Sequence, residues 1–277
     1  MQMGDDERGP GMDVLSYMRP SALNWVLGVP SIVAREHSRT GEADLGVGKA
    51  MLAVSDLSQP LERYIEHTLL KPDATEAQIV AHCREAAELG LLAVCVSPAW
   101  VSTAAQVLRG TSVLVDTTCG FPLGSETTTI KVAEAINSLR LGAGEIDMVM
   151  NIGALKSGLY DWVQQDMAQV AMACHARGAK LKVILEMGYL SDAEKVNACE
   201  LAADAGVDFV KTATGFGPGG ATIADVELMR RSIRPGMGVK AAGGIRDLAT
   251  ALAMIEAGAD RIGTSAGASI VRLAREL

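Results

Sequence analysis

The chain has 277 residues, with 25 Lys and Arg against 33 Asp and Glu, which gives a formal net charge of −8. Hydrophobic residues make up 49% and charged residues 21%, a balance typical of a folded globular protein that excludes extensive disorder. The length suits one large α/β domain or two smaller ones. The acidic net charge argues against a nucleic-acid-binding protein, because phosphate contacts need clustered Lys and Arg.

Cysteine usage and the first residues bear on the compartment. The five cysteines form no C-x-x-C pair, which predicts buried free thiols in a reducing environment. The four histidines lack metal-ligand spacing, so no metal site is predicted. The apolar run at 22–34 is interrupted and too short to span a bilayer, and residues 1–11 are acidic, unlike a targeting signal. We therefore predict a cytoplasmic protein with no membrane partner.

From about residue 61 onward, short β-rich runs alternate with helical segments. Eight runs are predicted as strands: Tyr64–Leu69, Leu92–Ser97, Val113–Cys119, Glu145–Asn151, Leu181–Met187, Asp208–Thr214, Gly238–Gly243 and Arg261–Ser265. Their spacing is about one βα unit, which predicts an α/β fold of the (β/α)8 TIM-barrel type over residues 61–277. An open, doubly wound sheet is the weaker alternative, since it usually has fewer strands. Residues 1–60 are an N-terminal extension of undecided role.

Helix ends carry their own signals between these strands. Thr75 with Gln78, and Ser191 with Glu194, have capping-box spacing, and Asp247 can cap a further helix. One phrase, in which a glycine ends a helix just before a strand, recurs at three helix ends: Gly142, Gly206 and Gly258. The repetition favours repeated βα modules over two unrelated domains.

Two lysines lie in the middle of predicted strands. Alternation along a strand puts Lys211 on the face opposite Val210, and Lys240 on the face opposite Val239. If the valines pack outward against helices, both lysines point into the barrel on adjacent strands. A lysine becomes a good nucleophile when burial and a second cation lower its pKa, and this pair would supply both. The alternative is that each lysine reaches the barrel rim as a solvated charge or a phosphate contact.

A carboxylate lies in the fourth predicted strand. Asp147 stands between Ile146 and Met148, so it is predicted to be buried. A buried carboxylate needs a partner, which could be a lysine or an ordered water. The residues alone leave two readings open: a structural ion pair, or a proton shuttle whose pKa is set by its surroundings.

The last two strands end in small residues. Gly243-Gly244 and the run Gly263–Gly267 would let backbone amides approach an anion at the usual phosphate position of such barrels. The alternative is that these glycines only make tight turns. The run Gly215–Gly220 matches G-x-G-x-x-G, but it follows the sixth strand and contains a proline, so dinucleotide binding is not predicted.

Seven short motifs occur in order at the strand ends between residues 61 and 272. They are Ile65–Pro72 (IEHTLLKP), Val94–Pro98 (VCVSP), Gly120–Gly124 (GFPLG), Glu145–Val149 (EIDMV), Val210–Phe216 (VKTATGF), Lys240–Arg246 (KAAGGIR) and Arg261–Ser265 (RIGTS). Together they resemble the deoxyribose-phosphate aldolase family. The resemblance implies reversible cleavage of 2-deoxy-D-ribose 5-phosphate to acetaldehyde and D-glyceraldehyde 3-phosphate, in deoxyribonucleoside catabolism. It also implies a class I aldolase that needs neither a metal nor another cofactor.

Matching positions imply the roles of individual residues. Lys211 would be the Schiff-base lysine, Lys240 the lysine that lowers its pKa, and Asp147 the acid–base partner. The residues implied around the substrate are Thr68, Cys95, Thr214, Gly243, Gly244, Gly263 and Ser265. The partners implied are a sugar phosphate and aldehydes, and a homo-oligomer, either a dimer or a tetramer, is left open.

The sequence also departs from the family pattern. Ala213 replaces a usual Ser, Ala266 replaces a small polar residue or Gly, and Glu66 replaces a commoner Asp. The first two put phosphate affinity, and the tolerance for non-phosphorylated aldehydes, in question. Two rival functions remain: another Schiff-base aldolase or transaldolase acting on sugar phosphates, and a non-catalytic barrel that binds a phosphosugar.

Overall fold

The computed structural model describes residues 54–277, so most of the predicted extension, residues 1–53, lies outside the described residues. Within the described part, Val54 and Leu57 pack against the edge of the hydrophobic core. The Ser58 hydroxyl also lies 2.8 Å from the Tyr64 hydroxyl, just before the first strand. Packing against the barrel thus begins before residue 61, and the proposed boundary at residues 60 and 61 stays a prediction.

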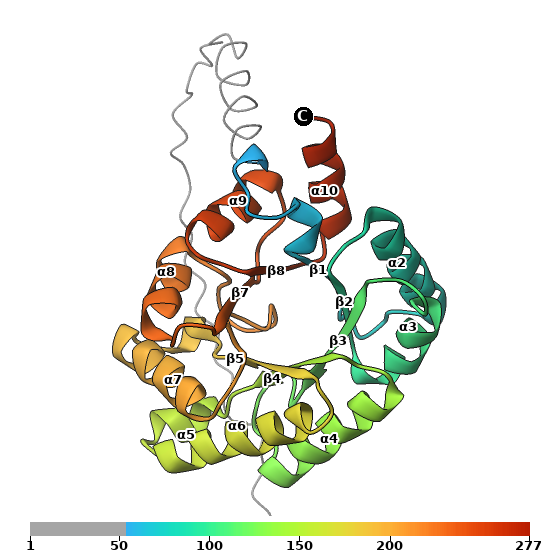
Figure 1. Cartoon of the computed structure of the whole chain (residues 1–277). Coiled ribbons are helices and arrows are strands. Elements are labelled where there is room, and N and C mark those ends of the chain that lie inside the picture. Colours follow the sequence, from blue (N-terminus) through green and yellow to red (C-terminus); the bar gives the residue numbers. More distant parts are fainter. Residues whose placement is uncertain (1–53) are drawn as a thin grey trace, which may run out of the picture. The chain divides into compact units, whose positions relative to one another are not determined.

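Eight parallel strands close into a barrel in chain order, which confirms the predicted fold (Figure 1). The strands are β1 (Ile65–Leu69), β2 (Ala93–Val96), β3 (Leu114–Cys119), β4 (Glu145–Val149), β5 (Lys180–Ile184), β6 (Phe209–Lys211), β7 (Gly238–Ala242) and β8 (Arg261–Thr264). Strand β1 pairs with β8 to close the ring, with Ile65 opposite Ile262. Each strand is followed by helical structure on the outside, because a parallel neighbour can be reached only by a crossover.

Strand β6 is shorter than predicted. It ends at Lys211, whereas the sequence pattern extends to Thr214. The Thr212 hydroxyl donates to the Ala242 carbonyl oxygen at 2.7 Å, and the Thr214 amide donates to Glu186 at 3.1 Å. Thr212 keeps a backbone bond to each side, from its amide to Lys240 and from the Met187 amide to its carbonyl oxygen, and side-chain bonds take over beyond it. The last residues of the predicted strand therefore form part of the barrel mouth.

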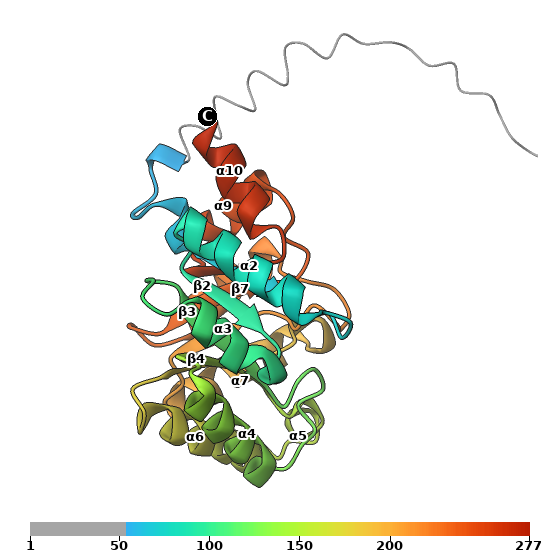
Figure 2. The same ribbon diagram turned by 90° about the vertical axis from the view of Figure 1, so that its right-hand side faces the viewer.

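The helices surround the strands, and α2 and α3 lie side by side over β2 and β3 (Figure 2). The α-helices are α2 (Glu76–Leu89), α3 (Val101–Val107), α4 (Thr128–Leu141), α5 (Ile152–Lys156), α6 (Tyr160–His175), α7 (Asp192–Asp204), α8 (Ile223–Ser232), α9 (Leu248–Glu256) and α10 (Gly267–Arg275). Short 3₁₀ turns are η1 (Leu61–Arg63), η2 (Pro98–Trp100) and η3 (Met187–Tyr189). Among residues 54–277, no helix is long and apolar enough to cross a membrane.

The predicted helix ends are confirmed. Both capping boxes form, at Thr75 and at Ser191, and the Asp247 side chain accepts a hydrogen bond from the Thr250 amide. The three glycines of the recurring phrase all have positive φ, and Gly142 has the largest, 112°. A Cβ atom at Gly142 would lie 2.7 Å from Ala105 Cβ, so this turn requires glycine for space as well as for its backbone conformation.

The hydrophobic core lies between the strands and the helices. Outward-facing strand residues such as Val94, Ile146, Val210 and Val239 are fully buried in it. The five cysteines are all free and buried. Because the outer faces of the strands are apolar, alternation sends their other side chains into the barrel.

Candidate active site

The two lysines singled out from the sequence meet inside the barrel. Lys211 on β6 is directly opposite Lys240 on β7 in the strand register, and the valines beside them face outward. Both ammonium groups donate to the same oxygen, Asp147 Oδ2, at 2.7 Å from Lys211 and 2.6 Å from Lys240. Asp147 on β4 therefore lies between the two lysines and joins them.

A third lysine, which the sequence analysis did not single out, completes the surroundings of Asp147. Lys182 on β5 donates to Asp147 Oδ1 at 3.0 Å and is fully buried. Burial alone would raise the pKa of Asp147, but Lys182, Lys211 and Lys240 together hold that pKa well below its usual value. Asp147 is therefore an anion held by three ammonium groups.

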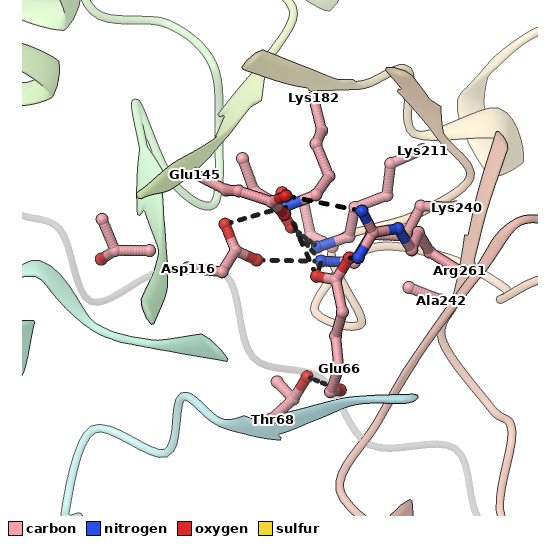
Figure 3. Close-up of polar contacts among 12 residues, drawn as sticks. Glu66, Thr68, Asp116, Glu145, Lys182, Lys211, Lys240, Ala242 and Arg261 are labelled. Atoms are coloured by element: carbon pink, nitrogen blue, oxygen red, sulfur yellow. Dashed lines mark hydrogen bonds and ion pairs between the residues drawn. The ribbon is translucent and has the colours of Figure 1, made fainter. Parts of the chain in front are cut away.

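The barrel interior holds further charged side chains, which lie around the lysines (Figure 3). Four carboxylates and four basic groups contact one another there: Glu66, Asp116, Glu145, Asp147, Lys182, Lys211, Lys240 and Arg261. We call these eight residues the interior charge network. Their formal charges balance, which is what burial in a medium of low dielectric constant requires.

The three lysines of the network differ in how many carboxylates hold their protons. Lys240 contacts Glu66 and Asp116 as well as Asp147. Burial lowers the pKa of Lys240, but Asp116, Asp147 and Glu66 raise it well above its ordinary value. The pKa of Lys182 is raised in the same way: burial lowers it, and its carboxylate contacts more than offset that. Lys240 and Lys182 therefore remain cations.

Lys211 stands apart from the other two lysines. Among the described residues, its ion pair is with Asp147 alone. It is also the lysine of the three that lines a cavity, since Lys182 and Lys240 are fully enclosed beneath it. Of the three, Lys211 thus has the fewest groups to hold its proton and the best access to a ligand.

The cavity lies at the carboxyl ends of the strands and has a volume of about 250 Å³. Six of the seven residues implied around the substrate line it, together with Lys211: Thr68, Thr214, Gly243, Gly244, Gly263 and Ser265. In a TIM barrel this end of the strands carries the reactive groups. A larger cavity, of about 700 Å³, is lined by residues that include Tyr64 and Asp260, which directly precede β1 and β8. None of the predicted site residues line this larger cavity.

Cys95, the seventh of these residues, does not line the cavity. It is fully buried on β2, and its sulfur lies within 4.8 Å of carboxylate oxygens of Asp116 and Asp147. Burial and the Asp116 charge raise the pKa of Cys95 well above its ordinary value, so the thiol is neutral. Its contact with a substrate stays a prediction.

Thr214 at the cavity wall is held by a buried carboxylate that the sequence analysis missed. Glu186, just after β5, accepts hydrogen bonds through one oxygen from both the amide and the hydroxyl of Thr214. The Thr214 hydroxyl also accepts from the Phe216 amide at 3.0 Å. Glu186 has a φ of 55°, an uncommon conformation for a residue other than glycine. The Thr214 hydroxyl therefore orders this loop, and its proton points to Glu186.

The part of the cavity wall formed by the loops after β7 and β8 has the features of an anion site. Gly243 and Gly244 both have positive φ, and a Cβ atom at Gly220 would lie 2.5 Å from the Gly243 carbonyl oxygen. Lys71 and Arg246 line the same cavity, and neither was singled out from the sequence. Two cations beside a glycine-rich wall suit a phosphate group.

The two alanines that depart from the family pattern are set back from this wall. Ala213 is buried, and neither Ala213 nor Ala266 lines the cavity. Their effect on phosphate affinity stays a prediction.

Two groups of side chains have the spacing of metal ligands. Cys95, Asp116 and Asp147 form one group, and Glu66, Asp116 and Glu145 form the other. Each of these carboxylates contacts a lysine or an arginine, so a metal ion would have to displace an ammonium or a guanidinium group. The donor set therefore suits ion pairs better than a metal, and the metal-free chemistry stays a prediction.

Comparison with known proteins identifies the family. The profile of the DeoC/LacD family aldolases matches residues 64–273, which is nearly the whole barrel. The chain belongs to this family. It is therefore an aldolase, a lyase that breaks and forms carbon–carbon bonds.

Individual relatives agree with the family assignment. The deoxyribose-phosphate aldolase of Thermococcus gammatolerans is 55% identical over 217 residues, which cover 78% of this chain and 96% of the relative. A crystal structure of a putative deoxyribose-phosphate aldolase from Coccidioides immitis aligns with a TM-score of 0.76 and 40% identity, over 84% of this chain and 97% of that one. The tetrameric deoxyribose phosphate aldolase of Aeropyrum pernix aligns with a TM-score of 0.74 and 31% identity, over 80% and 95% of the two chains.

Proposed function

We propose that this aldolase cleaves 2-deoxy-D-ribose 5-phosphate reversibly to acetaldehyde and D-glyceraldehyde 3-phosphate, through a Schiff base on Lys211. One observation carries the proposal. Lys211 lines the cavity at the barrel mouth, and its ammonium shares a single carboxylate oxygen with Lys240. A buried amine beside a second cation is activated for attack on a carbonyl. Relatives that bear the name deoxyribose-phosphate aldolase support the choice of substrate.

The first half of the reaction builds the electron sink. Neutral Lys211 attacks the C1 aldehyde of the open-chain sugar, and loss of water gives an iminium ion. Asp147 is close enough to take the proton that Lys211 gives up, because the two groups are 2.7 Å apart. Lys240 stays charged throughout, since three carboxylates hold its proton.

The second half breaks the carbon–carbon bond. Removal of the proton from the C3 hydroxyl cleaves C2–C3, releases D-glyceraldehyde 3-phosphate and leaves an enamine on Lys211. A proton delivered to C2 restores the iminium, and water then releases acetaldehyde. Asp147, which contacts Lys211, is the adjacent group that can hold and return these protons, a role worth about 10² to 10⁴ in rate.

The far end of the substrate carries the phosphate. Lys71, Arg246 and the glycines after β7 and β8 support a phosphate position at the part of the cavity wall that they form. Thr214 contributes by holding its loop, since its hydroxyl proton already goes to Glu186. This arrangement orients C1 of the sugar toward Lys211.

We propose further that the enzyme works in the cytoplasm as a homo-oligomer. The five buried free thiols support a reducing compartment. The tetrameric Aeropyrum pernix relative supports self-association. Size measurement by light scattering tests the second point, and a single-subunit mass over the whole concentration range would contradict it.

The direct test is cleavage of 2-deoxy-D-ribose 5-phosphate, followed by the appearance of acetaldehyde. We expect activity in the unmodified enzyme, activity that persists with a chelator, and none in Lys211→Leu. Lys180→Leu is the matched control, because Lys180 lies on β5 but is exposed. Activity that survives Lys211→Leu would contradict the assignment of the nucleophile, and loss with the chelator would contradict the metal-free chemistry.

A further inference from the structure

Asp116 is a buried carboxylate that the proposed mechanism does not use. It lies on β3, fully buried, opposite Cys95 on one side and Glu145 on the other. Asp116 Oδ2 accepts a hydrogen bond from Lys240 at 3.0 Å, and Oδ1 lies 3.1 Å from Lys182 Nζ. It does not line the cavity, so it cannot touch the substrate directly.

The charge of Asp116 is nonetheless close to the reacting amine. Lys240 donates to Asp116 and to Asp147, and Lys211 donates to the same oxygen of Asp147. Asp116 is thus separated from Lys211 by one ammonium and one carboxylate. The titratable and charged groups that face Asp116 come from six other strands: Glu66 on β1, Cys95 on β2, Glu145 and Asp147 on β4, Lys182 on β5, Lys240 on β7 and, beyond Glu66 and Glu145, Arg261 on β8.

Two carboxylates that share Lys240 respond to pH in different ranges. Burial and the Asp147 charge raise the pKa of Asp116 to about 7, against the opposing effect of Lys182 and Lys240. Burial also disfavours the charged form of Glu66, but Lys182 and Lys240 lower its pKa to about 2. Near neutral pH, Glu66 is therefore a fixed charge, whereas Asp116 gains or loses its charge.

We infer that Asp116 is a positioning residue that sets the pH range in which Lys211 acts as a nucleophile, through the ammonium of Lys240 that it shares with Asp147. When Asp116 is an anion, it favours the protonated form of Lys211. When Asp116 is neutral, the interior charge network is more positive, and Lys211 loses its proton more easily. The inference rests on the proposed role of Lys211 in the cleavage reaction.

The sign and size of the effect follow from the charges. Removing a negative charge near an ammonium group moves its deprotonation to lower pH. One unit charge at this separation, in an interior of moderate effective dielectric constant, corresponds to a shift of about one pH unit. Because protonation of Asp116 opposes protonation of Lys211, the two titrations also broaden each other in the unmodified enzyme.

The test is the acid limb of kcat/KM for cleavage of 2-deoxy-D-ribose 5-phosphate, which reports groups of the free enzyme. We expect the limb of Asp116→Asn to move about one pH unit toward lower pH and to narrow to a single ionisation. Asp116→Glu keeps the negative charge, so its acid limb should fall at the same pH as that of the unmodified enzyme. The inference would be overturned by either of two results. The acid limb of the unmodified enzyme could have the width of a single ionisation, or the acid limb of Asp116→Asn could fall at the same pH as that of the unmodified enzyme.

Controls separate this role from a structural one. Asp166→Asn makes the same chemical change in a buried pair outside the barrel, since Asp166 holds Lys131 at 2.6 Å. It should lower the melting temperature and leave the acid limb unchanged. If Asp116→Asn does not fold, Asp116→Ser removes the charge with a smaller side chain and carries the same expectation. An unmodified enzyme without cleavage activity would instead refute the proposed function, so the two failures can be told apart.

Discussion

The two faces of the same eight strands have opposite chemistry. On β4, Ile146 faces outward into a continuous apolar layer, while Asp147 beside it faces inward and contacts three lysines. The same alternation holds on β6 and β7, where valines face out and lysines face in. Barrel interiors are more often filled by branched aliphatic side chains.

The difference between the apolar outer face and the charged inner face separates the source of stability from the source of reactivity. Apolar burial contributes about 25 cal/mol per Å² removed from water, so the outer layer supplies most of the stabilisation. Buried ion pairs are often close to neutral in stability, because desolvation offsets their mutual attraction. The interior charge network therefore contributes chiefly to the reaction, and changes on the two faces should have different consequences.

The largest expected effect is that of Lys211→Leu, on the inner face. We expect kcat/KM for cleavage to fall by about 10³ or more, because the nucleophile is lost. The melting temperature should change little, since Asp147 keeps Lys182 and Lys240 as partners. Thermal unfolding measured with the steady-state rate checks both expectations. A protein that unfolds much earlier would mean that Lys211 is primarily structural.

Ile146→Ala makes the complementary change on the outer face of β4. The fully buried side chain leaves a cavity, so we expect a loss of about 2 to 5 kcal/mol in the free energy of unfolding. The rate per folded molecule should stay near that of the unmodified enzyme. Chemical denaturation and active-site titration measure the two quantities. A large fall in rate without a fall in stability would contradict the assignment of stability to the outer face and of reactivity to the inner face.

One titratable pair lies in the outer layer, between β1 and α2. The rings of His67 and His82 stack with centroids 3.8 Å apart, and His82 Nε2–H donates to the His67 carbonyl oxygen. Burial and the neighbouring His67 lower the pKa of His82 to about 4. The folded state thus resists a proton that the unfolded state accepts near its ordinary pKa of 6.5.

Stability should accordingly fall as the pH drops from about 6.5 to about 4, by at most about 3 kcal/mol from His82. His82→Gln keeps a hydrogen-bond donor without titrating in this range. We expect the free energy of unfolding of this variant to depend less steeply on pH over that interval. Parallel denaturant titrations at several pH values measure the slopes, and equal slopes would refute the role given to His82.

The smallest expected effect is at the barrel mouth, where Glu186 holds Thr214. Glu186→Gln removes the charge that accepts two hydrogen bonds from Thr214, so the loop beside the cavity should loosen. We expect KM for the phosphorylated substrate to rise about tenfold, with little change in kcat. Full kinetic analysis separates the two constants. A fall in kcat alone would indicate contact with the reacting atoms.

Sequence periodicity predicted the features that depend on one strand or on two neighbours. Alternation with Val210 and Val239 was enough to direct Lys211 and Lys240 inward, and adjacent strands had to bring them together. Strand β6 was predicted too long, because the sequence pattern does not reveal that Thr214, near its predicted end, is bonded through its amide and hydroxyl to the Glu186 side chain.

Most of the residues that were not predicted contact side chains from strands or loops far away in the sequence. Lys182, which the sequence analysis did not single out, carries the same signal as Lys211, since it is a lysine between the apolar residues Leu181 and Val183. Asp116 contacts Lys240 from the other side of the barrel. Which inward-facing residues of distant strands contact each other depends on the stagger of all eight strands. Glu186 contacts Thr214 only because two mouth loops meet. Such contacts follow from closure of the barrel, and no periodic pattern in the sequence predicts them.

The central claim is that Lys211 forms a covalent imine, and reductive trapping measures it most directly. Incubation with acetaldehyde and borohydride should leave an ethyl group on the Nζ atom of Lys211, located by peptide mass spectrometry. Lys240 and Lys182 should remain unmodified, because carboxylates hold their protons and neither lines the cavity. An ethyl group on Lys240 or Lys182, or none on any of the three lysines, would contradict the account.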